Sequence, residues 1–174
     1  MRRMGVVVGM AMLSSLFGCG GSAGSDGSDG SGSDASQRAD TTRAAAREAF
    51  PAVGEAVEAA SFSGSGGGRW AICGMQPSPS GAEYVAEIAI TQTNTGSSDY
   101  PGSIESALTS TGWTVDNRTG EVVEASKDGM TFRARYGSGG INLSIRSGCL
   151  DASKDVVAKL TDEPADKLGV APPS

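Results

Sequence analysis

The chain has 174 residues, carries a net charge of −6 and contains no histidine. Without histidine, Ser-His-Asp and Cys-His nucleophile systems, histidine metal sites and histidine acid–base catalysis are excluded. The negative charge is the wrong sign for binding a phosphate backbone, so we expect no nucleic-acid partner. Glycine contributes 26 residues, about 15% against an average near 7%, so part of the chain is not packed core.

The first residues have the pattern of an export signal. Arg2 and Arg3 precede a mostly apolar stretch at 5–17, whose length is typical of a signal-peptide hydrophobic region. As a helix this stretch would be about 20 Å long, shorter than the roughly 30 Å hydrocarbon core of a membrane. We therefore predict a signal peptide over 1–18 and no membrane span there.

Residues 16–19 read Leu-Phe-Gly-Cys and resemble the lipobox of bacterial lipoproteins, with leucine three before the cysteine and a small residue just before it. Phe17 departs from the motif, which usually has a smaller residue there. The resemblance implies that Cys19 receives a diacylglycerol and becomes the new N-terminus. Lipid chains such as palmitate would then hold the protein on the outer face of the cell membrane. The alternative is an ordinary secretory signal with Cys19 as a free thiol.

A low-complexity segment follows the predicted cleavage site, and fifteen of the eighteen residues at 20–37 are Gly, Ser or Asp. Such a segment has too little apolar surface to offset its ordering entropy. We therefore predict that 19–37 is a lipidated cysteine with a disordered tether. Loss of 1–18 leaves a net charge of −8, which anionic headgroups repel, so the lipid is expected to hold the domain at the membrane.

Cys73 and Cys149 are the two cysteines that remain once Cys19 is assigned to lipid. An even pair in an exported protein is expected to form a disulfide. The alternatives are two isolated thiols or half of a metal site. Because the chain has neither a CxxC spacing nor a histidine, we predict the disulfide, no metal and no cofactor.

The folded part is expected to begin with a helix at 40–60, where Phe50, Val53 and Val57 recur at helical spacing. Pro51 falls inside this helix and is expected to kink or divide it. Strands at 70–75 and 83–91 then predict a hairpin with a long loop.

A second helix is expected to begin near Pro101 and to end at Gly112, with a short strand at 113–116 as an option. A closing helix is expected at 151–160. The remaining tail, 161–174, contains three prolines and is predicted to be flexible.

The most regular part of the sequence has three expected strands, at 121–127, 130–136 and 141–147. Asp128 and Gly129 between the first two predict a two-residue hairpin turn. Both hairpin registers place Phe132, Ala134 and Tyr136 on one face of the sheet, and this agreement supports the pairing.

The order of elements predicts an α+β fold in which an antiparallel sheet of about five strands has helices packed on one face and one disulfide. Residues 38–160 would form a single domain, with Trp70 and Trp113 in its core. The chain from 65 to 150 resembles small actinobacterial lipoproteins of uncharacterised function. The residues that carry this resemblance are Trp70, Cys73, Gly112-Trp113, Asp128-Gly129 and Cys149. The resemblance implies a fold and a location, and no activity.

Three arginines, Arg133, Arg135 and Arg146, are expected on the polar face of the predicted sheet. They form a candidate anion-binding face for a wall polymer such as teichoic acid, a lipid headgroup or an acidic partner. The alternative is a solvated face on which Glu124 forms a cross-strand ion pair with Arg133, while Arg135 faces Val122.

These features favour a membrane-anchored, extracytoplasmic, non-catalytic binding or interaction module of the cell envelope, with an anionic wall polymer or an envelope protein as partner. A structural or assembly accessory of an envelope protein complex, using the loop at 76–82, is the alternative. A carboxylate-based hydrolase is a remote alternative, since nothing marks a deep cleft and aromatic side chains for stacking sugars are scarce. Its candidate carboxylates would be Glu83, Glu87, Glu121 and Glu124.

Overall fold

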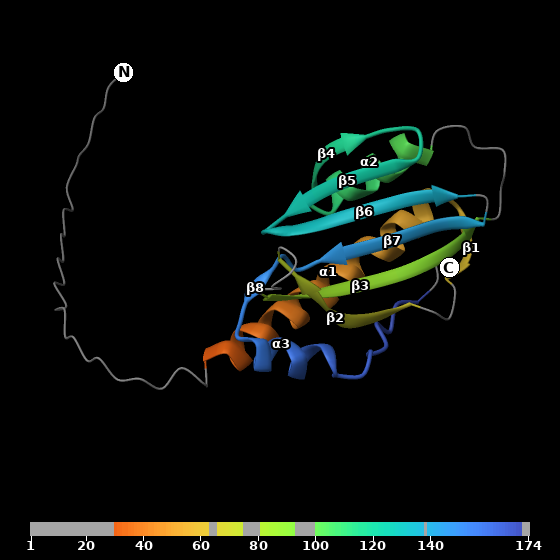
Figure 1. Ribbon diagram of the computed structural model, residues 1–174. Helices are drawn as coiled ribbons and strands as arrows, with labels where there is room; N and C mark the ends of the chain where they lie inside the picture. Colours follow the sequence, from red (N-terminus) through yellow and green to blue (C-terminus); the bar gives the residue numbers. More distant parts are fainter. Residues whose placement is uncertain (1–29, 63–65, 75–80, 93–99, 138, 172–174) are drawn as a thin grey trace, which may run out of the picture.

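The computed structural model describes residues 30–62, 66–74, 81–92, 100–137 and 139–171 (Figure 1). The helices are α1 (Gly30–Ala56), α2 (Tyr100–Ser110) and α3 (Lys154–Thr161). The strands are β1 (Ala59–Phe62), β2 (Gly67–Cys73), β3 (Gly81–Gln92), β4 (Thr114–Arg118), β5 (Val122–Lys127), β6 (Met130–Gly137), β7 (Gly140–Arg146) and β8 (Leu150–Asp151). The predicted signal peptide, Cys19 and the tether up to residue 29 lie outside the described residues.

All of these strands form one antiparallel sheet in the order β1–β3–β7–β6–β5–β4. β2 pairs with β3 on the same edge as β1, and β8 pairs with β3 on the edge of β7. After β3 the chain passes through α2 to the far edge of the sheet and returns as the meander β4 to β7. The predicted α+β fold and antiparallel sheet are confirmed, but the described residues form eight strands, more than the five expected. β4 matches the optional short strand at 113–116. The other two added strands, β1 and β8, are short, so their apolar pattern is weak.

The two hairpins of the meander have the predicted registers. Asp128 and Gly129 have φ angles of 49° and 76°, as the favoured two-residue turn requires. Lys127 pairs with Met130 in the first hairpin, and Tyr136 pairs with Ile141 in the second. Phe132 and Ala134 are fully buried on the face toward α1.

Helix α1 begins at Gly30, ten residues before the predicted start, and it is continuous through Pro51. Residues 30–37 therefore belong to the folded domain and correct the predicted extent of the tether. Ala35 and Ala39 are buried in the core, so small side chains provide the packing that the sequence analysis underestimated. A proline removes one helical hydrogen bond, and burial of Phe50 on α1 beside it offsets that loss.

The segment after α3 packs against the sheet and corrects the prediction of a flexible tail for residues 162–171. Asp166 and Gly68 exchange backbone hydrogen bonds of 3.0 and 2.9 Å. Arg47 Nε donates to the Leu168 carbonyl at 3.0 Å, and the Leu168 side chain is only 1% exposed.

The disulfide between Cys73 and Cys149 is confirmed, with an S–S distance of 2.07 Å. It joins the end of β2 to the chain just before β8 and closes a sequence separation of 76 residues. In the chain-entropy model a loop of this length contributes about 4.5 kcal/mol of stability. Gly81 lies against it, because a Cβ there would be 2.8 Å from Cys149 Sγ.

Both tryptophans lie in the core, as expected. Trp70 packs edge-on against Tyr84 with ring centroids 5.5 Å apart, and Trp113 packs similarly against Phe132 at 5.7 Å. In the part of the chain that the structure describes, no helix is long and apolar enough to cross a membrane.

We predict that Gly68→Ala lowers the free energy of unfolding by about 2–3 kcal/mol, because overpacking a closed core forces its neighbours apart. A Cβ at Gly68 would be 1.6 Å from Tyr84 Oη and 2.4 Å from Asp166 Oδ1. Urea unfolding measures the change. The matched control is Gly120→Ala, where a Cβ meets nothing within 4 Å, and a change there is expected to stay within about 0.5 kcal/mol. Equal stabilities of the two variants would contradict this role of Gly68.

Candidate functional site

The face of the sheet turned away from α1 carries most of the sheet's charged side chains, and we call it the open face. In Figure 1 the strands lie in front of α1, so this face is turned toward the viewer. Alternation along β6 puts Met130, Phe132 and Ala134 inside and leaves their neighbours exposed. The charged residues of the open face on β2, β3, β5, β6 and β7 are Arg69, Glu83, Glu87, Glu124, Arg133, Arg135 and Arg146.

Two of the three predicted arginines are paired with carboxylates. Arg133 Nε lies 3.5 Å from Glu124 Oε1, which confirms the cross-strand pair expected from the hairpin register. Arg146 forms a close ion pair with Glu83. Sequence analysis missed this second pair because it depends on the contact between β3 and β7, which are distant in the chain. Such exposed pairs contribute about 0–1 kcal/mol each.

Arg135 differs from its two neighbours, because no ion pair or hydrogen bond of its side chain is found among the described residues. It lies opposite Val122 on β5 and opposite Asn142 on β7, and neither neighbour is acidic. Its guanidinium therefore keeps its planar set of N–H donors for an external carboxylate or phosphate.

All three arginines line one hollow of about 370 Å³ over β3, β6 and β7. Ala89 and Ser144 also line it, and these small side chains leave room between the longer ones. The other lining residues are Glu87, Ile88, Asn142 and Leu143. The structure thus brings the predicted set together in a hollow that is rich in hydrogen-bond donors and has one carboxylate, Glu87, at its edge.

A second polar cluster lies on the opposite side of the sheet and joins α1, β3 and the segment after α3. Arg43 Nε donates to Tyr84 Oη at 3.0 Å, and Tyr84 Oη donates to Asp166 Oδ1 at 2.6 Å. Arg43 also forms an ion pair with Asp166. Burial, followed by the hydrogen bond to Asp166, raises the pKa of Tyr84 well above its ordinary value of 10.0. The mutual pairing of all three groups makes this a structural clamp.

Three of the four carboxylates considered for hydrolysis form ion pairs on the open face. Glu83 and Glu124 are held in ion pairs with Arg146 and Arg133, and Glu87 pairs with Arg69 at 3.3 Å. Among the described residues no three or more His, Cys, Asp or Glu side chains group as metal ligands do. Of the loop proposed to contact a protein complex, 76–80 lies outside the described residues.

Comparisons of the chain with protein-family models, with curated proteins and with solved structures find no match. Functional inference therefore rests on the chemistry of the open face and of the cavities.

We predict that the clamp makes stability fall above pH 10. The folded pKa of Tyr84 is raised above the unfolded value of 10.0, so its contribution is complete below pH 10 and is lost as the pH rises toward the folded value. The free energy of unfolding should fall by up to about 1.4 kcal/mol per pH unit there. Urea unfolding at pH 9 and pH 10.5 measures it.

Tyr84→Phe should be less stable at pH 9 and should show a smaller loss between the two pH values. Tyr100→Phe is the control and should retain the wild-type slope. An unchanged slope in Tyr84→Phe would show that other groups cause the alkaline loss.

Proposed function

We propose that the protein is a lipid-anchored, extracytoplasmic binding module of the cell envelope that binds anionic groups on its open face. The observation that carries the proposal is the guanidinium of Arg135, which has no ion pair within the described ranges and lines a hollow shared with Arg133 and Arg146. On a face of fully compensated charge each arginine would pair with a carboxylate, as Arg133 and Arg146 do, whereas Arg135 has Val122 and Asn142 opposite it.

The hollow favours binding of a polyanion over turnover of a substrate. Arginine binds carboxylate and phosphate through two parallel hydrogen bonds, and the polar side chains of Asn142 and Ser144 add neutral donors beside it. The site is open along the strands, so a linear polymer with repeated negative charges, such as a wall teichoic acid, fits it better than a small enclosed anion. On binding, the flanking ion pairs of Arg133 and Arg146 would either stay formed or break. Breaking them costs little free energy, because exposed ion pairs are weak.

The proposed location rests on the lipobox resemblance at 16–19. With a lipid on Cys19, ten residues separate the anchor from the start of α1. A fully extended chain covers at most about 3.6 Å per residue, so the domain would remain within roughly 40 Å of the bilayer. A domain held within that range of the membrane would meet the polymers of the envelope.

Arg135→Gln is expected to weaken binding of poly(glycerol phosphate) about tenfold or more, because it removes charge-assisted hydrogen bonds. Calorimetric titration at low salt measures the affinity. The matched control is Arg118→Gln on β4, whose arginine is already paired with Glu105 at 2.7 Å. Equal affinities of the two variants, or no binding by the wild type, would exclude the proposed anion site. Retention of a co-purifying protein complex in that case would favour the accessory role.

The anchor has a separate test. Cys19→Ala should move the exported protein from the membrane fraction to the soluble fraction, because one thiol carries the lipid and neither stretch 5–17 nor the described helices provides a span. Fractionation with immunoblotting measures the distribution, and a Cys73→Ala, Cys149→Ala double variant controls for loss of cysteines in general. Persistence of Cys19→Ala in the membrane would contradict lipidation at this residue.

A further inference from the structure

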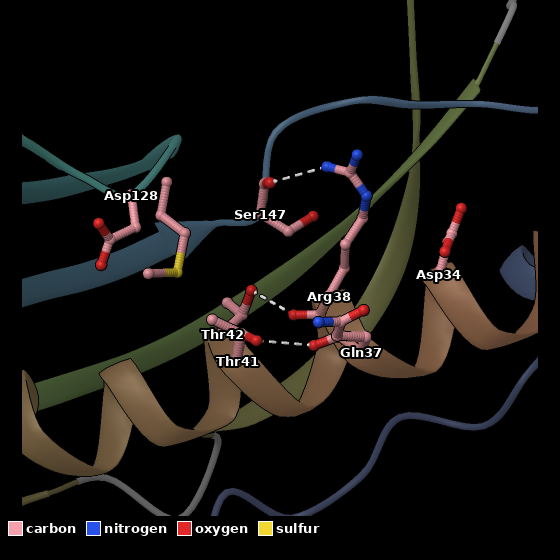
Figure 2. Close-up of a pocket in the computed structure, with 8 residues that line it drawn as sticks. Asp34, Gln37, Arg38, Thr41, Thr42, Asp128 and Ser147 are labelled. Carbon is pink, nitrogen blue, oxygen red and sulfur yellow. Dashed lines mark hydrogen bonds between the residues drawn. The ribbon is translucent and has the colours of Figure 1, made fainter. Parts of the chain in front are cut away.

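A second cavity, of about 360 Å³, lies between α1 and the turn that joins β5 to β6 (Figure 2). It shares no lining residue with the hollow of the open face. Its lining residues are Asp34, Gln37, Arg38, Thr41, Thr42, Asp128, Met130 and Ser147. Its volume lies at the lower end of the range for small-molecule sites, about 300–1,000 Å³.

The cavity presents opposite charges that do not pair with each other. Asp34 and Arg38 have the four-residue spacing at which helical side chains form ion pairs. In the structure Arg38 instead points to the backbone of Ser147, with 3.5 Å between Arg38 Nη1 and the carbonyl oxygen (Figure 2). Within the described ranges neither Asp34 nor Arg38 has an ion pair. The guanidinium therefore has most of its donors available inside the cavity.

A second acidic residue, Asp128, lines the cavity at the hairpin turn (Figure 2). It also has no hydrogen-bond or ion-pair partner in the described part of the chain. The turn fixes its position, because Asp128 has a φ of 49° and is followed by Gly129 at 76°. Together, the rigid turn and α1 hold carboxylates and a guanidinium around one space.

One hydroxyl group of the cavity is available as an acceptor. Thr41 Oγ1 and Thr42 Oγ1 donate to the carbonyls of Gln37 and Arg38, both at 2.8 Å. Each hydroxyl proton is thereby used within α1. Thr42 is fully buried, whereas Thr41 is exposed and keeps its oxygen lone pairs for an external donor. This acceptor suits an ammonium group, as the two carboxylates do.

We propose that this cavity binds a small zwitterion, with its phosphate or carboxylate on Arg38 and its ammonium group near Asp128 and the Thr41 hydroxyl. A simple anion would be repelled by Asp34 and Asp128, and a simple cation would be repelled by Arg38. A molecule with both charges can place its anionic end on Arg38 and its ammonium group near Asp128, and charge-assisted hydrogen bonds at each end give it orientation.

Two sources share this chemistry. One is a soluble molecule of the amino-acid type, and the other is the headgroup of phosphatidylethanolamine. The headgroup is a candidate because the lining begins at Asp34, fifteen residues after Cys19. That second source rests on the proposed lipidation at Cys19, whereas the zwitterion site itself does not.

The test titrates the full chain, purified in neutral detergent, with phosphoethanolamine and with β-alanine, and follows the amide resonances of Thr41 and Thr42. Inorganic phosphate and ethylammonium serve as the single-charge probes. We expect at least one zwitterion to bind about tenfold or more tightly than the probe that matches its anionic or cationic end. Arg38→Gln and Asp128→Asn should each weaken that binding about tenfold or more, since each removes a charged hydrogen bond.

Arg118→Gln is the control variant and should bind as the wild type does. Binding of phosphate as tightly as phosphoethanolamine, or full binding by either cavity variant, would overturn the proposal. So would the failure of both zwitterions to bind. Because Arg118 and Arg135 lie outside this cavity, loss of polyanion binding in Arg135→Gln with retained zwitterion binding separates the two sites.

The same resonances, recorded in lipid nanodiscs with and without phosphatidylethanolamine, identify the source. Shifts that require phosphatidylethanolamine and vanish in Arg38→Gln assign the headgroup. Binding of the soluble zwitterion without such shifts assigns a soluble ligand.

Discussion

The alternation of side chains along β3 is the constraint on which the rest of the molecule depends. β3 pairs with β1 and β2 on one edge and with β7 and β8 on the other. Tyr84, Ile88 and Ile90 therefore point to the helices, whereas Glu83 and Glu87 point to the open face. A register slip of one residue would bury both glutamates under α1. The ion pairs of Glu83 and Glu87 on the open face and the clamp under the sheet both follow from this single register.

The clamp shows how β3 also holds the segment after α3 in place. Tyr84 reaches from β3 to Asp166, and Asp166 in turn pairs its backbone with Gly68 on β2. The phenol fills the space that a side chain at position 68 would need, so glycine there is a packing requirement. The glycine run at 66–68 continues into β2, which begins at Gly67. Its lack of side chains lets a polar network close against the edge of the sheet.

Contacts between residues that are close in the chain could be predicted from the sequence, whereas contacts between distant residues could not. The Asp128-Gly129 hairpin and the pair between Glu124 and Arg133 depend on neighbouring residues, so alternation and turn chemistry were enough to predict them. The pair between Arg146 and Glu83 depends on two strands some sixty residues apart, and no local pattern indicates their contact. The early start of α1 and the packing of Leu168 were missed for a related reason. Whether small or isolated apolar residues are buried depends on the part of the protein that packs against them, and the local sequence does not show that part.

The net charge of −6 means that an anion site on this protein cannot rely on the overall charge of the chain to attract its ligand. At physiological ionic strength charges more than about 8 Å apart are largely screened, so Arg135 is influenced mainly by the charged groups nearest to it. The chain as a whole therefore gives an approaching polyanion no long-range attraction, and contact at the hollow must supply the affinity. Because steering acts on association rates, slow association and a modest dependence on added salt are the signature of such a site. A strongly basic surface would show fast association and a steep salt dependence.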